Sequence, residues 1–424
     1  MQQVILGHIL NPKSDNKADF IYNGALVIEG KVIKELGTAD KMLKRYPQAD
    51  IKDFKGQVIM PPFFDMHFHW VQDDVREMPK DSLLNWLEKY TFPSEAKFAS
   101  KSYSQKKAKS FFKRLAKAGT LGGACFSSIH EHALDYAMDH VVGDFVIGNV
   151  LMTMNSPKNL SQSSSDAIKL VKKLSKKYKH RYCLTPRFAI ATDPVTMEKT
   201  AKEVRKYNCF KQSHLSETPN EISFVTSLYQ EMPGFEDIKT YTDIYNRVGM
   251  LGPKSLMGHG IHLKPEELKI LSQTKTVIVH CPTSNAETKD YGLGSGLFNF
   301  KKAERYKVRW VMGSDIGGGP FLSMFDVMRS FVEQNKKAQV SGATYTKALY
   351  RSTLAGAKVM ELEQKKGNFA QDKEANFLVL KKFRVLKDDT AESYLARIIK
   401  KGVRNRLDYD DYADHVFFQG QKLI

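Results

Sequence analysis

Between about Pro61 and about Lys366, short apolar runs alternate with longer amphipathic stretches. The amphipathic stretches have the apolar spacing of surface helices, and the apolar runs have the length of buried strands. In order, the runs are FFDMHFH, GTLGGACFSS, DFVIGNVLMT, YCLTPRFAI, CFKQSHLS, SLMGHG, TVIVHCPTS and VRWVMGSD. Eight strand–helix units in sequence predict an α/β fold of the (β/α)8 TIM-barrel type.

The two ends of the chain have a different texture. The start contains strand-like runs with a glycine turn, QQVILGHILNP, ALVIEG and KVIKELG, and the end contains GNFAQDKEANFLVL and HVFFQGQKLI. We therefore expect a small β-sandwich domain built from both termini. The predicted domains are residues 1–58 and 367–424 for the β-sandwich domain, the latter with a charged extension, and residues 59–366 for the barrel.

Length and cysteine usage place the chain among soluble intracellular proteins. No apolar run approaches the roughly 20 residues that span a bilayer, and the first residues lack a secretory signal. The four cysteines are widely spaced and form no CxxC pair, so neither disulfides nor a cysteine zinc site is expected. A cytoplasmic location follows as an expectation.

The net charge of +18 raises the question of nucleic acid. The lysines are spread along helical stretches such as KSYSQKKAKSFFKRLAKAG, at the spacing of a solvated face. This distribution favours a basic soluble surface over a nucleic-acid site, and the sequence contains no zinc-finger or RNP-type motif. A basic nucleic-acid-binding protein on an inactive barrel remains the alternative of another class.

Ionisable side chains stand at the ends of most predicted strands, where barrels carry their function. The set is His67, His69, Arg187, His214, Glu217, His259, His280 and Asp315. His67 and His69 are two apart, so in a strand both imidazoles point to the same face. A divalent cation between them would explain the pair, and histidines with a carboxylate suit Zn²⁺. Each residue alone also has an ordinary structural explanation; Asp315, for example, could cap a helix.

Other histidines are weaker candidates. His130 and His132 form a second HxH after the second strand, but no aspartate accompanies them and we expect no metal there. Four more lie outside the predicted strand ends and are expected to be structural or exposed. They are His8, His140, His180 and His415.

These motifs together resemble the amidohydrolase superfamily and, within it, the guanine deaminases. The resemblance rests on FFDMHFH, WLEKYTFPSEAKF, TPRF, QSHLSE, MGHG, HCPTSN with GLGSGLF, and GSDIGGG with SMFDVMR, in the family's order from Pro61 to about Gly367. It implies a homodimer with one metal per chain, zinc or alternatively iron, that binds guanine. The short apolar runs and the spread of the lysines lead us to expect contact with neither membrane nor nucleic acid. The implied metal ligands are His67, His69, His214 and Asp315. The implied guanine contacts are Gln72, Arg187, Phe188 and Glu217.

The chain departs from the family pattern at three places. The segment TSNAETKDYGLGSG is longer than expected, a glycine is missing near Asp372, and the part from Lys381 is an unusual charged extension. The first lies at the active-site rim and bears on substrate fit.

The resemblance implies hydrolytic deamination of guanine to xanthine and ammonia. A catalytic divalent metal lowers the pKa of water from 15.7 to about 7. We expect Glu217 to protonate a ring nitrogen, Asp315 to move a proton from water to the leaving amine, and His259 to orient the attacking oxygen. Glu217 could instead be a helix N-terminal carboxylate, and Arg187 a barrel ion-pair residue.

The sequence leaves one other kind of amidohydrolase possible and argues against another kind of deaminase. A related amidohydrolase acting on another aminopurine, a pterin or a triazine is the alternative within the superfamily. The cytidine-deaminase type requires P-C-x-x-C, which the sequence lacks.

Overall fold

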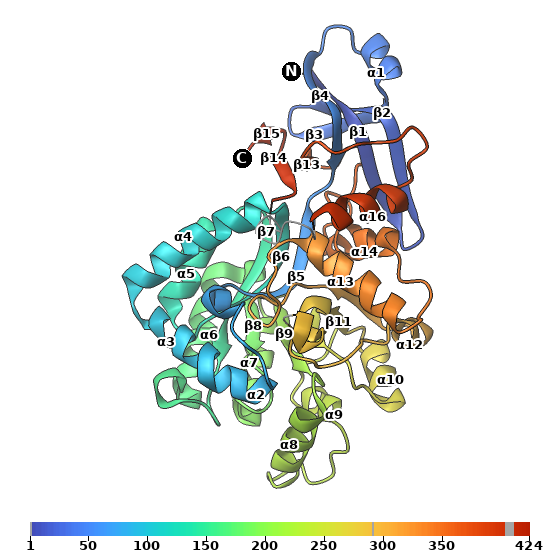
Figure 1. Ribbon diagram of the computed structural model, residues 1–424. Coiled ribbons are helices and arrows are strands. Elements are labelled where there is room, and N and C mark those ends of the chain that lie inside the picture. Colours follow the sequence, from blue (N-terminus) through green and yellow to red (C-terminus); the bar gives the residue numbers. More distant parts are fainter. Residues whose placement is uncertain (1, 291, 403–410) are drawn as a thin grey trace. The chain divides into compact units, whose positions relative to one another are not determined.

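The computed structural model describes residues 2–290, 292–402 and 411–424 (Figure 1). The chain divides into two compact units. One comprises Met1–Asp65, Lys113–Gly123 and Phe321–Ile424, and the other comprises Met66–Phe112 and Ala124–Pro320. The domain bounds expected from the sequence, at residues 58/59 and 366/367, stay a prediction.

Eight strands form one sheet in the order β12-β11-β10-β9-β8-β7-β6-β5. Each corresponds to one of the eight apolar runs, which confirms the barrel prediction. The strands are β5 (Phe63–His69), β6 (Thr120–Ser127), β7 (Asp144–Leu151), β8 (Cys183–Pro186), β9 (Phe210–Leu215), β10 (Ser255–His259), β11 (Val277–His280) and β12 (Arg309–Met312). From β7 to β12, neighbouring strands pair in parallel.

Backbone hydrogen bonds bring the two ends of this sheet together. The Asp315 N–H donates to His67 O at 2.8 Å, and the His69 N–H donates to Ile316 O at 2.5 Å. The segment after β12 is therefore tied to β5, the first strand of the series. This closure places the carboxyl end of β5 beside Asp315.

The strands are almost entirely buried, as expected where helices cover a parallel sheet. The connecting helices have clear start signals. Asp193 accepts a hydrogen bond from the Thr196 N–H at the start of α7, and Thr218 and Glu221 form a capping box at the start of α8. The longer connecting helices are α4 (Lys101–Lys117), α5 (Glu131–His140), α6 (Ser164–Tyr178), α7 (Pro194–Arg205), α8 (Pro219–Gln230), α9 (Tyr241–Arg247), α10 (Pro265–Gln273) and α12 (Phe300–Arg305).

A second sheet contains strands from both ends of the chain, in the order β15-β14-β13-β4-β1-β2-β3 (blue and red in Figure 1). This confirms the β-domain formed by the two termini. Its strands are β1 (Gln2–Ser14), β2 (Lys17–Glu29), β3 (Val32–Thr38), β4 (Asp50–Met60), β13 (Phe377–Leu380), β14 (Ala413–Phe418) and β15 (Gln421–Lys422). Its larger core includes Ile5, Ile28, Ile59, Phe377 and Phe417.

The same unit contains four helices that follow the barrel strands in the sequence. They are α13 (Met324–Lys337), α14 (Tyr345–Arg351), α15 (Leu354–Val359) and α16 (Ala391–Gly402). Helix α16 lies in the charged extension noted from Lys381, of which residues 403–410 are outside the described residues. Asp372, where the sequence lacks a glycine, has φ +64°, a conformation that glycine adopts most easily and aspartate tolerates.

Two further observations concern the helices and the cysteines. Within the described ranges, no helix combines the length and the apolar character that crossing a bilayer requires. All four cysteines are buried free thiols.

Candidate active site

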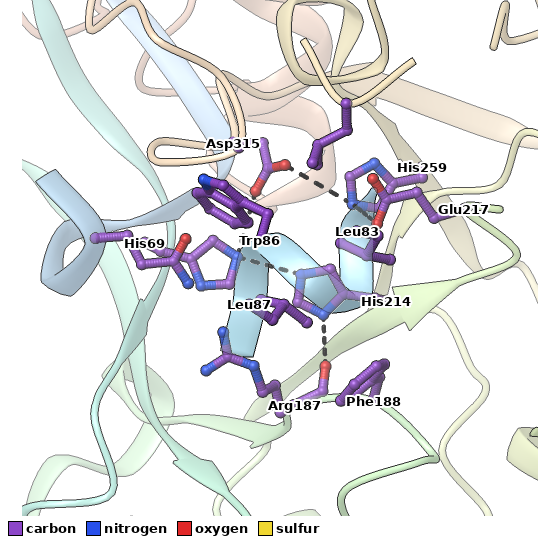
Figure 2. A pocket seen from close by; sticks show the side chains of 13 residues that line it. His69, Leu83, Trp86, Leu87, Arg187, Phe188, His214, Glu217, His259 and Asp315 are labelled. Carbon is purple, nitrogen blue, oxygen red and sulfur yellow. Dashed lines mark hydrogen bonds and ion pairs between the residues drawn. The ribbon is translucent and has the colours of Figure 1, made fainter. Parts of the chain in front are cut away.

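Four side chains converge at the carboxyl ends of three strands. His67 and His69 come from β5, His214 from β9, and Asp315 follows β12. One potential ligand atom from each lies within 4.8 Å of all the others. The Nε2 atoms of His67 and His69 lie 3.2 and 3.3 Å from Asp315 Oδ1. The Nε2 atoms of His69 and His214 are 3.2 Å apart (Figure 2).

These three separations fit ligands of one zinc ion. Zinc–nitrogen bonds of about 2.0–2.1 Å give ligand-to-ligand separations of about 3.3–3.4 Å. His214 Nδ1 donates to Arg187 O at 2.5 Å, so its Nε2 faces His69 as a lone pair. Three imidazole nitrogens and one carboxylate oxygen that converge at one place form the donor set that a divalent cation takes, so the residues present suit a bound metal ion.

Burial keeps the histidines neutral and able to act as ligands. Desolvation lowers the pKa of His69 to about 4, partly opposed by Asp315, and lowers the pKa of His214 well below its usual range. Burial alone would raise the pKa of Asp315, but hydrogen bonds from His67 and His69 outweigh it and hold that pKa well below the usual range. His69 and His214 are thus neutral and Asp315 is ionised, which is the protonation state that metal binding requires of these ligands.

A second carboxyl group lies beside the cluster in a different protonation state. Desolvation, with a further contribution from Asp315, raises the pKa of Glu217 to about 8, although a hydrogen bond from Ser295 at 3.0 Å opposes the shift. Glu217 Oε2 lies 3.4 Å from His259 Nε2, which is 3.9 Å from Asp315 Oδ2 (Figure 2). A protonated carboxyl and an ionised one therefore face the same space, which is the pairing that acid–base catalysis uses.

The backbone at these positions is unusual. Ser216, His259 and Asp315 have φ values of 51°, 69° and 51°, in a region that non-glycine residues rarely occupy. Gly258 is needed for a different reason: a Cβ there would lie 2.7 Å from His67 Cε1. Asn285 Oδ1 lies 2.9 Å from His259 Nδ1 and orients that ring from the far side.

Polar groups suited to a heterocycle lie on another side of the pocket. Arg187 and Gln72 are buried and both hydrogen-bond to Glu95, while Gln72 Oε1 accepts from the Gly317 N–H at 3.3 Å. Phe188, next to Arg187, lines the same space. The apolar part of the lining consists of Leu83, Trp86, Leu87, Phe188 and Leu293.

The segment that carries Leu83, Trp86 and Leu87 runs across the pocket (Figure 2). It comprises α2 (Leu83–Trp86), the π-helical turn η2 (Leu87–Thr91) and α3 (Phe92–Ala96). A π-helical turn of this kind is frequent at functional sites. The pocket is therefore a slot whose lining combines apolar side chains, the polar side chains of Gln72 and Arg187, and His69, His214 and Asp315 of the cluster.

Residues 58–410 match the model of the amidohydrolase family. The chain belongs to the amidohydrolase family. The chain is also similar to a guanine deaminase of Escherichia coli (strain K12), with 32% identity over 372 residues that cover 85% of this chain and 82% of the relative. A guanine deaminase of Rattus norvegicus is 29% identical over 83% of this chain and 80% of that protein.

Solved structures agree with the sequence comparison. The guanine deaminase of C. acetobutylicum with guanine bound in its active site has a TM-score of 0.88 and 26% identity, and the match covers all of both chains. The E. coli guanine deaminase structure has the same TM-score at 28% identity, covering 100% of this chain and 99% of that one.

The structure brings most of the predicted residues to this amidohydrolase site. The four expected ligands form one cluster. The adjoining pocket is lined by the other expected site residues, which are Gln72, Arg187, Phe188, Glu217 and His259. His280, at the end of β11, is instead buried against Phe298 and Trp310. His132 Nε2 bonds Phe98 O at 2.8 Å and its ring stacks on His130, in keeping with a structural role for that pair.

Sequence reasoning missed several residues of the site. Glu95 lies in WLEKYTFPSEAKF, which the sequence marks only as a family motif, and Leu293 and Ser295 lie in the glycine-rich turn GLGSG at the end of the long segment. The sequence gives little indication of their roles, because their hydrogen-bond partners are distant in the chain. Glu95, for example, accepts a hydrogen bond from Arg187, which lies 92 residues later. The long segment thus supplies Leu293 to the pocket wall and Ser295 as a hydrogen-bond donor to Glu217.

Proposed function

We propose that this chain is a guanine deaminase that hydrolyses guanine to xanthine and ammonia. The observation that carries the proposal is one slot with a three-histidine, one-carboxylate cluster and protonated Glu217 at one end, and Arg187 and Gln72 at the other. The similarity to guanine deaminases over more than four-fifths of the chain supports it.

The metal that we assign to the cluster is zinc, one per chain, held by His67, His69, His214 and Asp315. Three nitrogens and one carboxylate oxygen within 4.8 Å of one another support this choice, and iron is the alternative. When bound, such a metal supplies a water that ionises near neutral pH.

The chain's own residues would handle the protons. Attack of water on the amino-bearing carbon places negative charge on a ring nitrogen, and the Glu217 carboxyl, protonated at neutral pH, donates a proton to that nitrogen. Asp315, ionised in the site, accepts the proton that the attacking water loses and gives it to the amine, which leaves as ammonia. The remaining proton of the added hydroxyl returns to Glu217 as the new carbonyl of xanthine forms. His259, near both carboxyl groups, orients the attacking oxygen.

Recognition would depend on the polar end of the slot. Arg187 donates only and suits the guanine carbonyl, whereas Gln72 both donates and accepts and suits an amide edge. Phe188 provides a flat apolar wall for the ring. Adenine has neither carbonyl nor amide N–H, so its binding would leave these buried groups unpaired.

The deciding experiment measures ammonia release from guanine by purified protein of known metal content. We expect turnover that follows the zinc content, and discrimination against adenine of as much as ~10⁴–10⁵ in kcat/KM. Parallel assays use adenine, a pterin and an aminotriazine. Faster turnover of any of these than of guanine would reassign the substrate, and turnover of adenine equal to that of guanine would refute the guanine proposal.

We further propose a cytoplasmic homodimer. The dimer is supported by the resemblance to the family alone. Four buried free thiols support a reducing compartment.

A further inference from the structure

Three buried polar side chains meet in the wall of the slot. Glu95 is 0% exposed, and Arg187 and Gln72 are each 2% exposed. Arg187 Nη1 donates to Glu95 Oε2 at 2.7 Å and to Oε1 at 2.9 Å, and Gln72 Nε2 donates to Glu95 Oε1 at 2.8 Å. Arg187 and Gln72 both line the pocket, whereas Glu95 lies behind them.

This arrangement fixes which way Gln72 points. A carboxylate only accepts hydrogen bonds and a backbone N–H only donates, so the Gln72 NH₂ must face Glu95 and its carbonyl must face the Gly317 N–H. One N–H of Gln72 and one lone pair of its oxygen remain for a ligand. Glu95 thereby orients the Gln72 amide so that one donor and one acceptor of that amide face the slot.

Helix α3 also fixes Arg187. The guanidinium lies 5.2 Å from the ring centroid of Phe92, on the same short helix as Glu95. Within the described residues, the guanidinium hydrogen-bonds to Glu95 through Nη1, and Nε and Nη2 are available as donors to a ligand. Helix α3 therefore holds Arg187 through the charge of Glu95 and through the ring of Phe92.

The charge of Arg187 is already balanced when the slot is empty of ligand. A buried cation without a partner favours anionic ligands, but Glu95 supplies a full negative charge at hydrogen-bond distance. An anionic ligand at this end would meet the Glu95 carboxylate as well as the guanidinium. A neutral heterocycle with a carbonyl meets only donors that are already oriented.

We propose that Glu95 is a positioning residue that also sets the charge preference of the site, so that neutral planar heterocycles bind in preference to anionic ones. The inference rests on the proposed function for the identity of the heterocycle. It extends that function by naming the group that makes Arg187 and Gln72 selective.

The test compares two planar purines that are not substrates, by calorimetry on metal-loaded protein at neutral pH. Hypoxanthine is neutral and lacks the amino group that reacts, and urate is an anion. In Glu95→Gln, we expect hypoxanthine to bind roughly 10- to 100-fold more weakly, since charged hydrogen bonds are lost. Urate should bind as well as before or better, so the ratio of the two dissociation constants shifts by at least tenfold.

Steady-state kinetics supply a second readout. Glu95 does not contact the reacting end of the slot, so we expect Glu95→Gln to raise KM for guanine far more than it lowers kcat. Glu95→Asp keeps the charge but shortens the side chain. It should weaken hypoxanthine binding while leaving the hypoxanthine-to-urate ratio within about threefold of the wild-type value.

The matched control is Glu88→Gln, an exposed glutamate of the same helical segment, which should change none of these values. Equal weakening of both ligands in Glu95→Gln, or unchanged hypoxanthine binding in Glu95→Asp, would overturn the proposal. If Glu95→Gln does not fold, Arg187→Gln replaces it: the unbalanced Glu95 should then shift the ratio further against urate, and an unmoved ratio would contradict the proposal.

Failure of the proposed function gives a different result. Wild-type protein that does not deaminate guanine, but whose ligand preference still responds to Glu95, would refute the deaminase assignment and leave the inference standing.

Discussion

At the scale of single residues, the proposed chemistry depends on a carboxyl group that stays protonated at neutral pH. Burial and the charge of Asp315 raise the pKa of Glu217 from 4.5 to about 8. Replacement by glutamine keeps the shape and removes the proton. We expect Glu217→Gln to keep its metal and to lose roughly 10²–10⁴-fold in kcat, as measured by ammonia release with parallel metal analysis. A near-normal rate would exclude Glu217 as the proton donor.

The same group predicts a pH dependence. A general acid acts in its protonated form, and a raised pKa means that this form is present below about 8 and disappears above it. We expect kcat to fall above about pH 8 by up to tenfold per pH unit. The profile of Glu217→Gln should lack this alkaline limb, and persistence of the limb would assign it to another group.

The ligand set gives a third prediction. His67→Ala removes one imidazole from the cluster, so we expect the purified variant to contain far less than one metal per chain and to have almost no activity. His130→Ala alters the other HxH pair and serves as the control, with full metal content. Unchanged metal in His67→Ala would refute the assigned site.

Residues differ in how far the sequence alone predicts them. The HxH spacing places His67 and His69 on one face of a strand without any knowledge of the fold. His214 and Asp315 required the family resemblance, because only barrel closure brings β9 and the end of β12 to β5. Neither the spacing of residues nor the family resemblance predicted the role of Glu95, since that role consists of contacts with Gln72 and Arg187, which are distant in the sequence.

At the scale of elements, strand β10 shows how backbone packing holds a ligand. An added Cβ at Gly258 would lie 2.7 Å from His67 Cε1, so Gly258→Ala must push that imidazole aside. We expect the variant to fold and to bind metal roughly 10- to 100-fold more weakly, a change typical of losing support around a metal ligand. Titration against a chelator measures it. Met257→Leu, a change of similar volume at the buried neighbouring position, should keep the wild-type affinity.

Elements with a strong periodic signal were predictable and those with mixed signals were not. Most of the barrel strands are largely apolar runs, because both faces are buried, whereas β9 reads FKQSHL. β4 reads DIKDFKGQVIM, whose first residues are largely exposed, and it was not expected as a strand. The segment of α2, η2 and α3 has no regular period either, and its shape comes from the pocket that it covers.

At the scale of the whole molecule, the proposed dimer gives a direct measurement. We expect light scattering at micromolar concentration to report about twice the chain mass of 48.2 kDa. A mass equal to one chain would refute the dimer.

The pairing of β13 with β4 has a consequence for synthesis on the ribosome. Leu378 pairs with Met60 and Val379 with Ile59, so the first strands to emerge wait for about 320 more residues before their sheet can be completed. At about 5–20 residues per second, that wait lasts roughly 15–65 s. During it, the unpaired edge of β4 is open to other nascent chains. Products that terminate before β13 should therefore aggregate or be captured by chaperones, even though every residue of the metal cluster has already been made.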